Sequence, residues 1–203
     1  IVFVSLWVSI SHCFGGWLSY HKPEFKGKVI DAETKEPIEG AVVVVVYKKH
    51  SLISGPGGGY TSVLKVKETL TDKNGEFYFP AYTTVIQPNS REDYAEFIIY
   101  KHGYDHFPSQ GTILSGLGLD SIQTFFSKET GSEGELEVMV KGGNFKMVKV
   151  AFGIVELPPL TTWEERNKAN MISPTDDKKQ WPLLHEMIEK EEEWLRKNKG
   201  WKR

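Results

Sequence analysis

Histidine is the residue type in this chain that could most directly do chemistry, because a neutral imidazole can bind a metal ion or transfer a proton near neutral pH. His102 and His106 flank Asp105 within the segment KHGYDH, and His50 is a third histidine that folding could bring near them. A converged cluster of this kind would supply the metal ligands of a small metal-dependent hydrolase. Histidines in loops are more often exposed than ligating, so this hydrolase is the alternative to a non-catalytic function.

The other patterns that could do chemistry are incomplete. His21 and Glu24 have a His-x-x-Glu spacing but no third ligand near them in the sequence. His185 and Glu189 lie four positions apart on an expected helix, where a helical zinc motif would need a second histidine. The glycine-rich segment 55–59 lacks the Lys and Ser/Thr of a phosphate-binding loop, and no Gly-x-Ser-x-Gly motif occurs. We therefore expect that the chain is not an enzyme and has no cofactor.

The composition narrows the class of partner. The chain has 203 residues, with 25 basic and 27 acidic side chains and a formal net charge of -2. This balance argues against nucleic acid as a partner, because such proteins carry a basic excess that neutralises phosphates. The single cysteine, Cys13, excludes an intrachain disulfide framework and a zinc site built from several cysteines. The length suits one well-packed domain with extensions, or two small domains.

The N-terminal segment, residues 1–20, has the apolar run of a signal peptide or membrane anchor. Ile10 and Ser11 before Cys13 fit the pattern of a bacterial lipoprotein signal, whereas His12 stands where a small residue is expected. Three interpretations remain: a lipoprotein signal with acylated Cys13, an ordinary secretory signal cut nearby, or a retained membrane anchor. Each places the remaining chain outside the cytoplasm, as a periplasmic or outer-membrane-anchored protein of the cell envelope, with membrane attachment through the N-terminus.

β-Branched residues dominate the segment before His50. Five consecutive valines, 42–46, favour a strand because their side chains are stiff at χ1. An unbroken apolar run predicts burial on both faces, by the core on one side and by the core or a neighbouring segment on the other. Upstream, Pro37 and Gly40 predict the turn through which the chain re-enters the sheet.

Turn residues divide the remaining β-rich segments. Asn74 and Gly75, followed by Phe77, predict a hairpin with a two-residue turn. Glycines and asparagine at 142–144 predict a second hairpin. We expect residues 105–134, between these segments, to form a long loop with one short helix.

The C-terminal part has helical patterns. Thr161 and Thr162 each precede a glutamate by three residues, which is the capping-box spacing of a short helix. A final helix is predicted from Pro182, with its apolar residues on roughly one face. That face could bind a partner protein or pack on the chain's own sheet, and the sequence favours neither.

Three segments taken in order, GKVIDAETKEPIEGAVVVV, TLTDKNGEFYFP and YKHGY, resemble the carboxypeptidase regulatory-like domain. The resemblance covers about residues 25–104. It implies a mainly β fold, a seven-stranded Greek-key sandwich of the transthyretin-like (prealbumin-like) type, which we place over residues 24–157 with glycine-rich insertions. The helical patterns of residues 158–203 depart from this module and predict a C-terminal extension. The residues that carry it are Gly27, Asp31, Pro37, Gly40, Asp72, Gly75, Phe77, Gly103 and Tyr104.

The resemblance does not imply peptidase activity, because the catalytic domain of such enzymes is a separate unit. It implies a non-catalytic binding or structural module of the envelope, with a protein or carbohydrate as partner. A further alternative is a subunit of a larger envelope assembly that docks through the C-terminal helix.

Overall fold

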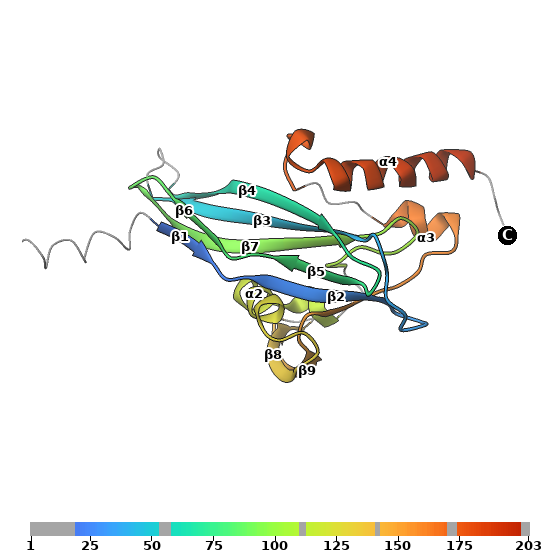
Figure 1. The fold of residues 1–203 in the computed structure, drawn as a ribbon, viewed down its shortest axis with the longest axis horizontal. Helices are drawn as coiled ribbons and strands as arrows, with labels where there is room; N and C mark the ends of the chain where they lie inside the picture. The colour runs from blue at the N-terminus through green and yellow to red at the C-terminus, as the bar shows by residue number, and fades with distance from the viewer. Residues whose placement is uncertain (1–18, 53–57, 110–112, 141–142, 170–173, 200–203) are drawn as a thin grey trace, which may run out of the picture.

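The computed structural model describes residues 19–52, 58–109, 113–140, 143–169 and 174–199. Cys13 and almost all of the predicted signal segment lie outside these ranges. Within them the fold is mainly β, with helices below the strands and above them in the view of Figure 1. The strands are β1 (Ser19–Lys22), β2 (Phe25–Asp31), β3 (Val42–Ser51), β4 (Tyr60–Leu70), β5 (Glu76–Phe79), β6 (Tyr82–Val85), β7 (Ser90–Tyr100), β8 (Glu133–Met139), β9 (Phe145–Ala151) and β10 (Ile154–Leu157).

Two three-stranded sheets form the body of the protein. One has the order β4-β3-β7 and is antiparallel. The other has the order β10-β2-β5, with β10 parallel to β2 and β5 antiparallel to it. The antiparallel pair β1-β6 extends the β2-β5 pair toward the left of Figure 1, beyond a break at Pro23 and Pro80. β1 includes Ser19 and Tyr20, so the predicted signal or anchor segment, residues 1–20, overlaps the folded part by these two residues.

The five valines of β3 are fully buried on both faces of their sheet, as predicted. Val43 and Val45 belong to the core between the two sheets, where the rings of Phe25 and Phe97 meet edge to face with centroids 5.0 Å apart. The other three valines belong to a second apolar cluster on the opposite face. Each buried valine side chain stabilises the fold by roughly 1.5 kcal/mol.

The second apolar cluster is covered by the C-terminal helix α4 (Pro182–Lys197), which lies above β3 and β4 in Figure 1. Trp181, just before the helix, and Leu184 in its first turn are buried against β3. Of the two interpretations of this helix, packing on the chain's own sheet is therefore the one observed. No helix in the described ranges is long and apolar enough to cross a membrane.

The predicted turn before the valines is present. Gly40 has φ of 67°, and Pro37 forms an isolated bridge with Ile30. The Thr71 hydroxyl accepts a hydrogen bond from the Ala41 N–H at 2.8 Å and donates to the Ile38 carbonyl at 2.7 Å. The turn is thus held to the end of β4 by side-chain as well as backbone hydrogen bonds.

The prediction of a hairpin at Asn74-Gly75 is wrong in its pairing. A tight turn is present, with Gly75 at φ 75° and the Asp72 carboxylate accepting from the Asn74 N–H at 2.9 Å. However, β4 pairs with β3 and β5 pairs with β2, so the turn carries the chain from one sheet to the other. Local turn residues fix the chain reversal, whereas the choice of partner strand depends on which apolar face meets the core.

The segment 105–134 contains one short helix as expected, α2 (Leu119–Ser127), whose Phe125 and Phe126 are buried against the core. β8 and β9 form the second predicted hairpin, with Met139 opposite Phe145 at its tip. A 3-10 helix, Ile113–Gly116, precedes α2, and another, Lys178–Gln180, precedes α4. The helix α3 (Trp163–Lys168) begins with the predicted capping box, formed by Thr162 and Glu165.

Candidate functional site

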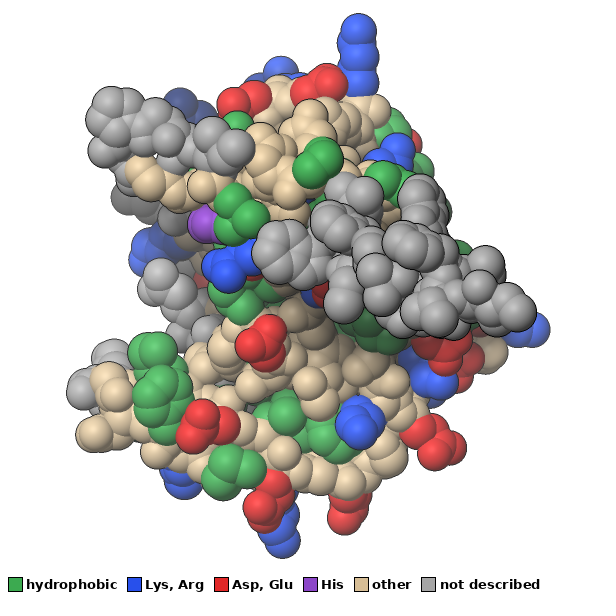
Figure 2. All heavy atoms as spheres, turned by 90° about the vertical axis from the view of Figure 1, so that its left-hand side faces the viewer, with side chains coloured by type: hydrophobic (Ala, Val, Ile, Leu, Met, Phe, Trp, Pro, Cys, Tyr) green, Lys and Arg blue, Asp and Glu red, His purple; other side chains and the backbone are tan. Residues whose placement is uncertain are grey.

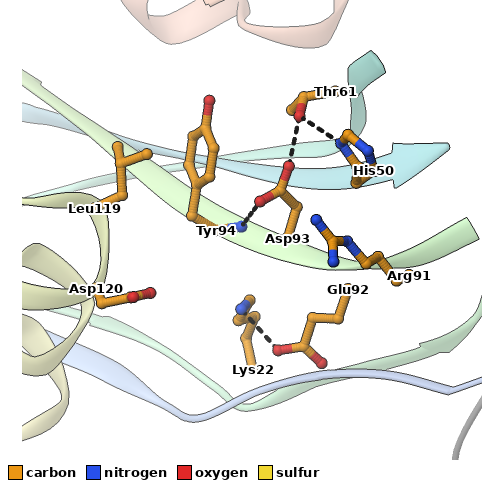
Figure 3. A pocket seen from close by; sticks show the side chains of 9 residues that line it. All are labelled: Lys22, His50, Thr61, Arg91, Glu92, Asp93, Tyr94, Leu119 and Asp120. Carbon is orange, nitrogen blue, oxygen red and sulfur yellow. Dashed lines mark hydrogen bonds and ion pairs between the residues drawn. The ribbon is translucent and has the colours of Figure 1, made fainter. Parts of the chain in front are cut away.

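A recess of about 580 Å³ opens at the end of the molecule where β1 begins. It lies among the ends of β1 and β3, the starts of β4 and β7 and the first turn of α2 (Figure 3). Its volume falls in the range of small-molecule sites, about 300–1,000 Å³. Its lining is mostly polar and consists of Lys22, His50, Thr61, Arg91, Glu92, Asp93, Tyr94, Leu119 and Asp120.

One feature of the sequence and one of the strand pairing place these side chains. β7 begins with the polar run Arg91–Tyr94 and becomes apolar only further along, so the same strand supplies the recess and then the core. β3 has an irregularity after Tyr47, where its register shifts against both β4 and β7. Such bulges re-aim the side chains that follow them, here those of Lys48 to His50.

A short hydrogen-bonded group forms one wall of the recess (Figure 3). The Thr61 hydroxyl donates to Asp93 Oδ2 at 2.6 Å and lies 3.3 Å from His50 Nδ1. Asp93 Oδ1 accepts from the Tyr94 N–H at 3.0 Å. In a nucleophile–base–orienting group, the carboxylate contacts the imidazole. Here the Asp93 carboxylate and the His50 imidazole each contact the Thr61 hydroxyl instead. The arrangement therefore positions a carboxylate and an imidazole on the wall of the recess.

An ion pair forms the floor on the β1 side. Lys22 Nζ lies 2.7 Å from Glu92 Oε1, and the His21 N–H donates to Glu92 Oε2 at 3.0 Å. Lys22 is 6% exposed although it is a lysine. A buried ammonium requires a partner, and this pair ties β1 to the start of β7.

The charges of the recess nearly balance. Lys48, on the neighbouring strand, pairs with Glu96 at 2.6 Å and lies 5.2 Å from the ring centre of Tyr94. Figure 2, the view of this end of the molecule, shows acidic and basic side chains interspersed over the surface. The recess therefore suits a ligand with many hydrogen-bonding groups more than one with a high charge.

The structure does not bring the three predicted metal-ligating histidines together. In the register of β3 and β7, His50 lies opposite Arg91 at the recess. His102 follows Tyr100, which lies opposite Val42 at the other end of β3. From Val42 to His50 the strand extends about 26 Å. In the described part of the chain, no group of three His, Cys, Asp or Glu side chains could hold a metal ion. The geometry thus gives the hydrolase alternative no metal centre from His50, His102 and His106.

His102 belongs to a different cluster, which joins α3 and α4 to the end of β7. Arg166 donates to both oxygens of Glu191, through Nε at 2.6 Å and Nη2 at 2.7 Å. Tyr100 Oη and the Gly103 N–H also donate to Glu191, at 2.9 and 3.2 Å. Glu191 is 3% exposed and Arg166 7% exposed, so both charges of this pair are buried.

Burial and hydrogen bonding oppose each other at Glu191. Burial raises the pKa of the carboxyl, but the hydrogen bonds from Arg166, Tyr100 and Gly103 outweigh it and hold the pKa below its usual value. Burial lowers the pKa of His102, and the nearby Arg166 charge adds to this effect against the attraction of Glu191. Because a guanidinium only donates, the 2.9 Å contact from Arg166 Nη2 requires an unprotonated His102 Nε2. We call this cluster of Arg166, Glu191, Tyr100 and His102 the latch, because it holds α3 and α4 to the end of β7. His102 is neutral in it.

The third predicted histidine, His106, is buried beside the core. Its Nδ1 lies 3.2 Å from Asp105 Oδ1, and the Asp105 side chain also accepts from the His106 N–H. His106 is adjacent to Phe107, whose backbone pairs with Ile99 of β7. Its position is that of a residue in the connection between β7 and α2.

The residues of the family-like motif gather at the end of the molecule opposite the recess. Asp31 accepts from the Thr34 N–H at 2.9 Å and from Tyr104 Oη at 3.0 Å, and the Thr34 contact is the main reason that the pKa of Asp31 is lowered. Gly27 packs against the buried Phe77 ring and leaves no space for a Cβ. Gly103 has φ of 87°. These residues hold turns and strand ends together.

Most of the recess was not predicted from the sequence. Of its lining residues only His50 was singled out, because Arg91, Glu92 and Asp93 look like ordinary surface charges in a strand. The one indication was the polar start of an otherwise apolar segment, SREDYAEFIIY.

Comparison of the chain with protein-family models, with curated proteins and with solved structures finds no match.

Proposed function

We propose that this chain is a non-catalytic binding module of the cell envelope and that its ligand occupies the recess. The observation that carries the proposal is the recess itself, a polar hollow of about 580 Å³ at one end of the β-rich body. Side chains from four strands and a helix converge there, which is the arrangement of a preformed site. The envelope location comes from the apolar N-terminal segment with Cys13, as a lipoprotein signal or another leader.

The domain type is part of the proposal. A seven-stranded Greek-key sandwich of the carboxypeptidase regulatory-like type is consistent with the two facing sheets and with the structural roles of Asp31, Gly75 and Tyr104. The chain crosses between sheets after β2, after β4 and after β6. In such a module the sandwich is a scaffold, and the ligand is bound by residues at one end of it.

A carbohydrate of the envelope fits the recess better than a protein surface does. The recess presents carboxylates, a guanidinium and a hydroxyl around the Tyr94 ring (Figure 3). Asp120 and Arg91 are exposed and lie on different elements, so one saccharide could reach hydrogen-bonding groups on both sides. Saccharides offer many hydroxyls and little charge, which matches a lining of balanced charge.

The test is co-sedimentation of residues 19–203 with purified peptidoglycan sacculi, followed by the variants Arg91→Gln and Asp120→Asn. Each substitution removes a charged hydrogen-bonding group from the recess without changing a buried residue, so we expect binding to weaken by roughly tenfold or more. Arg196→Gln, an equal charge change on the exposed face of α4, is the control and should bind as the wild type does.

Three results would contradict the proposal. If neither the sacculi nor a panel of soluble envelope polysaccharides binds, or if Arg196→Gln weakens binding as much as Arg91→Gln, the recess is not the carbohydrate site. If the bound saccharide is recovered as shorter products, the module is not non-catalytic.

A further inference from the structure

A second cavity, of about 400 Å³, lies on the far side of the core from α4. Its inner surface is apolar: Phe107 and Phe125 are buried at its base, and Leu114, Val150 and Ile154 are half-buried around it. These side chains come from the connection after β7, the 3-10 helix before α2, α2 itself, β9 and β10. The cavity thus forms where the β8–β9 hairpin and α2 pack beside the sandwich.

Two charged side chains stand at the rim of this cavity, and they differ in their partners. Glu156 already has one, because Lys35 Nζ lies 2.8 Å from its Oε2. Lys149 makes no ion pair within 4.0 Å with any residue that the structure describes, although Glu135 is its cross-strand neighbour. The rim therefore offers one uncompensated positive charge beside an apolar interior.

We propose that this cavity binds a small amphipathic carboxylate, with its alkyl or aryl body against Phe107 and Phe125 and its carboxylate at Lys149. Apolar cavities that carry a few polar groups are the usual form of ligand sites. Each methylene moved from water into such an interior strengthens binding roughly fourfold, so the body supplies most of the affinity. Lys149 selects an anionic head group over a neutral one.

The site is independent of the recess proposed above, because the two share no lining residue. Their ligand chemistries also differ, since the recess is polar with balanced charge and this cavity is apolar with a cationic rim. A variant that loses binding at one of the two sites should keep binding at the other.

The probe is sodium decanoate, used below its micellar concentration, with decan-1-ol as the uncharged counterpart and 3-phenylpropanoate as the aryl arm. Binding is measured by calorimetry on the full 203-residue chain and mapped by NMR shifts of the Ile154 and Val150 methyl groups. We expect decanoate to bind and to shift these methyl groups while leaving the Arg91 amide unchanged.

Two kinds of variant separate the body from the head group. Ala151→Phe places a ring at the cavity from an exposed position, so it should abolish binding of decanoate and decanol without overpacking the core. Lys149→Gln should weaken decanoate roughly two- to fivefold and leave decanol unchanged, as expected for a partly exposed ion pair. Lys146→Gln, on the same strand but outside the cavity, is the matched control and should have no effect.

The proposal is overturned if decanoate and 3-phenylpropanoate both fail to bind, or if bound decanoate shifts the recess and not Ile154. Equal weakening by Lys149→Gln and Lys146→Gln would show non-specific charge attraction in place of a head-group contact. Val150→Phe gives a second block of the cavity, and its thermal melting confirms folding before its binding is interpreted.

Discussion

Replacing Glu191 by Gln should strongly destabilise the protein. The substitution keeps the size of the side chain and removes its charge, so Arg166 becomes a buried cation without a carboxylate. Breaking a buried pair by removing one partner costs about 3–5 kcal/mol, more than a surface pair of the same geometry. The free energy of unfolding, measured by urea denaturation with tryptophan fluorescence, should fall by this amount.

Two companion variants make this prediction specific. Glu193→Gln removes an equal charge two positions later, where its partner Lys197 is exposed, and should cost no more than about 0.5 kcal/mol. The double variant Arg166→Met with Glu191→Gln should recover much of the stability, because no unpaired charge remains buried. A cost below about 1 kcal/mol for Glu191→Gln, or simple additivity in the double variant, would refute the latch.

The pH dependence follows from the direction of the Glu191 shift. Its pKa is lower in the folded protein than in the unfolded chain, so the folded state binds fewer protons and stability rises with pH through this range. The contribution is fully present above the unfolded value of about 4.3 and is lost as pH falls through the lower folded value. The stability difference between wild type and Glu191→Gln should therefore be constant at neutral pH and shrink on acidification below about pH 4.

Three further substitutions test how the elements are held. In urea denaturation, Gly75→Ala should lower the free energy of unfolding clearly more than Gly131→Ala. Both glycines have positive φ, but of the two only Gly75 has a backbone carbonyl where the added Cβ would lie. Equal losses of stability would contradict this account. Trp181→Ala should lower the free energy of unfolding by about 3–5 kcal/mol, because it empties the contact of α4 with β3, and a small effect would show that α4 is not held there. Tyr104→Phe should cost about 1 kcal/mol through its lost hydrogen bond to Asp31, and an unchanged melting temperature would show that this bond contributes nothing.

Patterns with a local cause were predictable from the sequence. The valine strand follows from side-chain stiffness, and the capping box of α3 from the spacing of Thr162 and Glu165. The turn at Gly75 was also predictable, because Asp72, Asn74 and a glycine suffice to form it. What that turn connects was not, since strand pairing depends on contacts between segments distant in the sequence.

The candidate site was less predictable than the fold. His102 and His50 looked like members of one cluster because the sequence gives no distance between the two ends of β3. Arg166 and Glu191 are 25 positions apart, and nothing in either helical segment marks them as buried partners. The recess likewise needs β3, β4 and β7 to be aligned, with the irregularity after Tyr47, before its residues meet.

The latch bears on the alternative that the C-terminal helix docks the chain into a larger assembly. The apolar face of α4 is already used, because Leu184 lies against the valines of β3 and Glu191 is held by Arg166. Removing residues 181–203 would expose that valine face and leave Arg166 unpaired, so loss of a partner after such a deletion would only report unfolding. Docking through α4 must use its exposed face instead. The informative variants are charge reversals there, such as Lys190→Glu, which leave the packing against β3 intact.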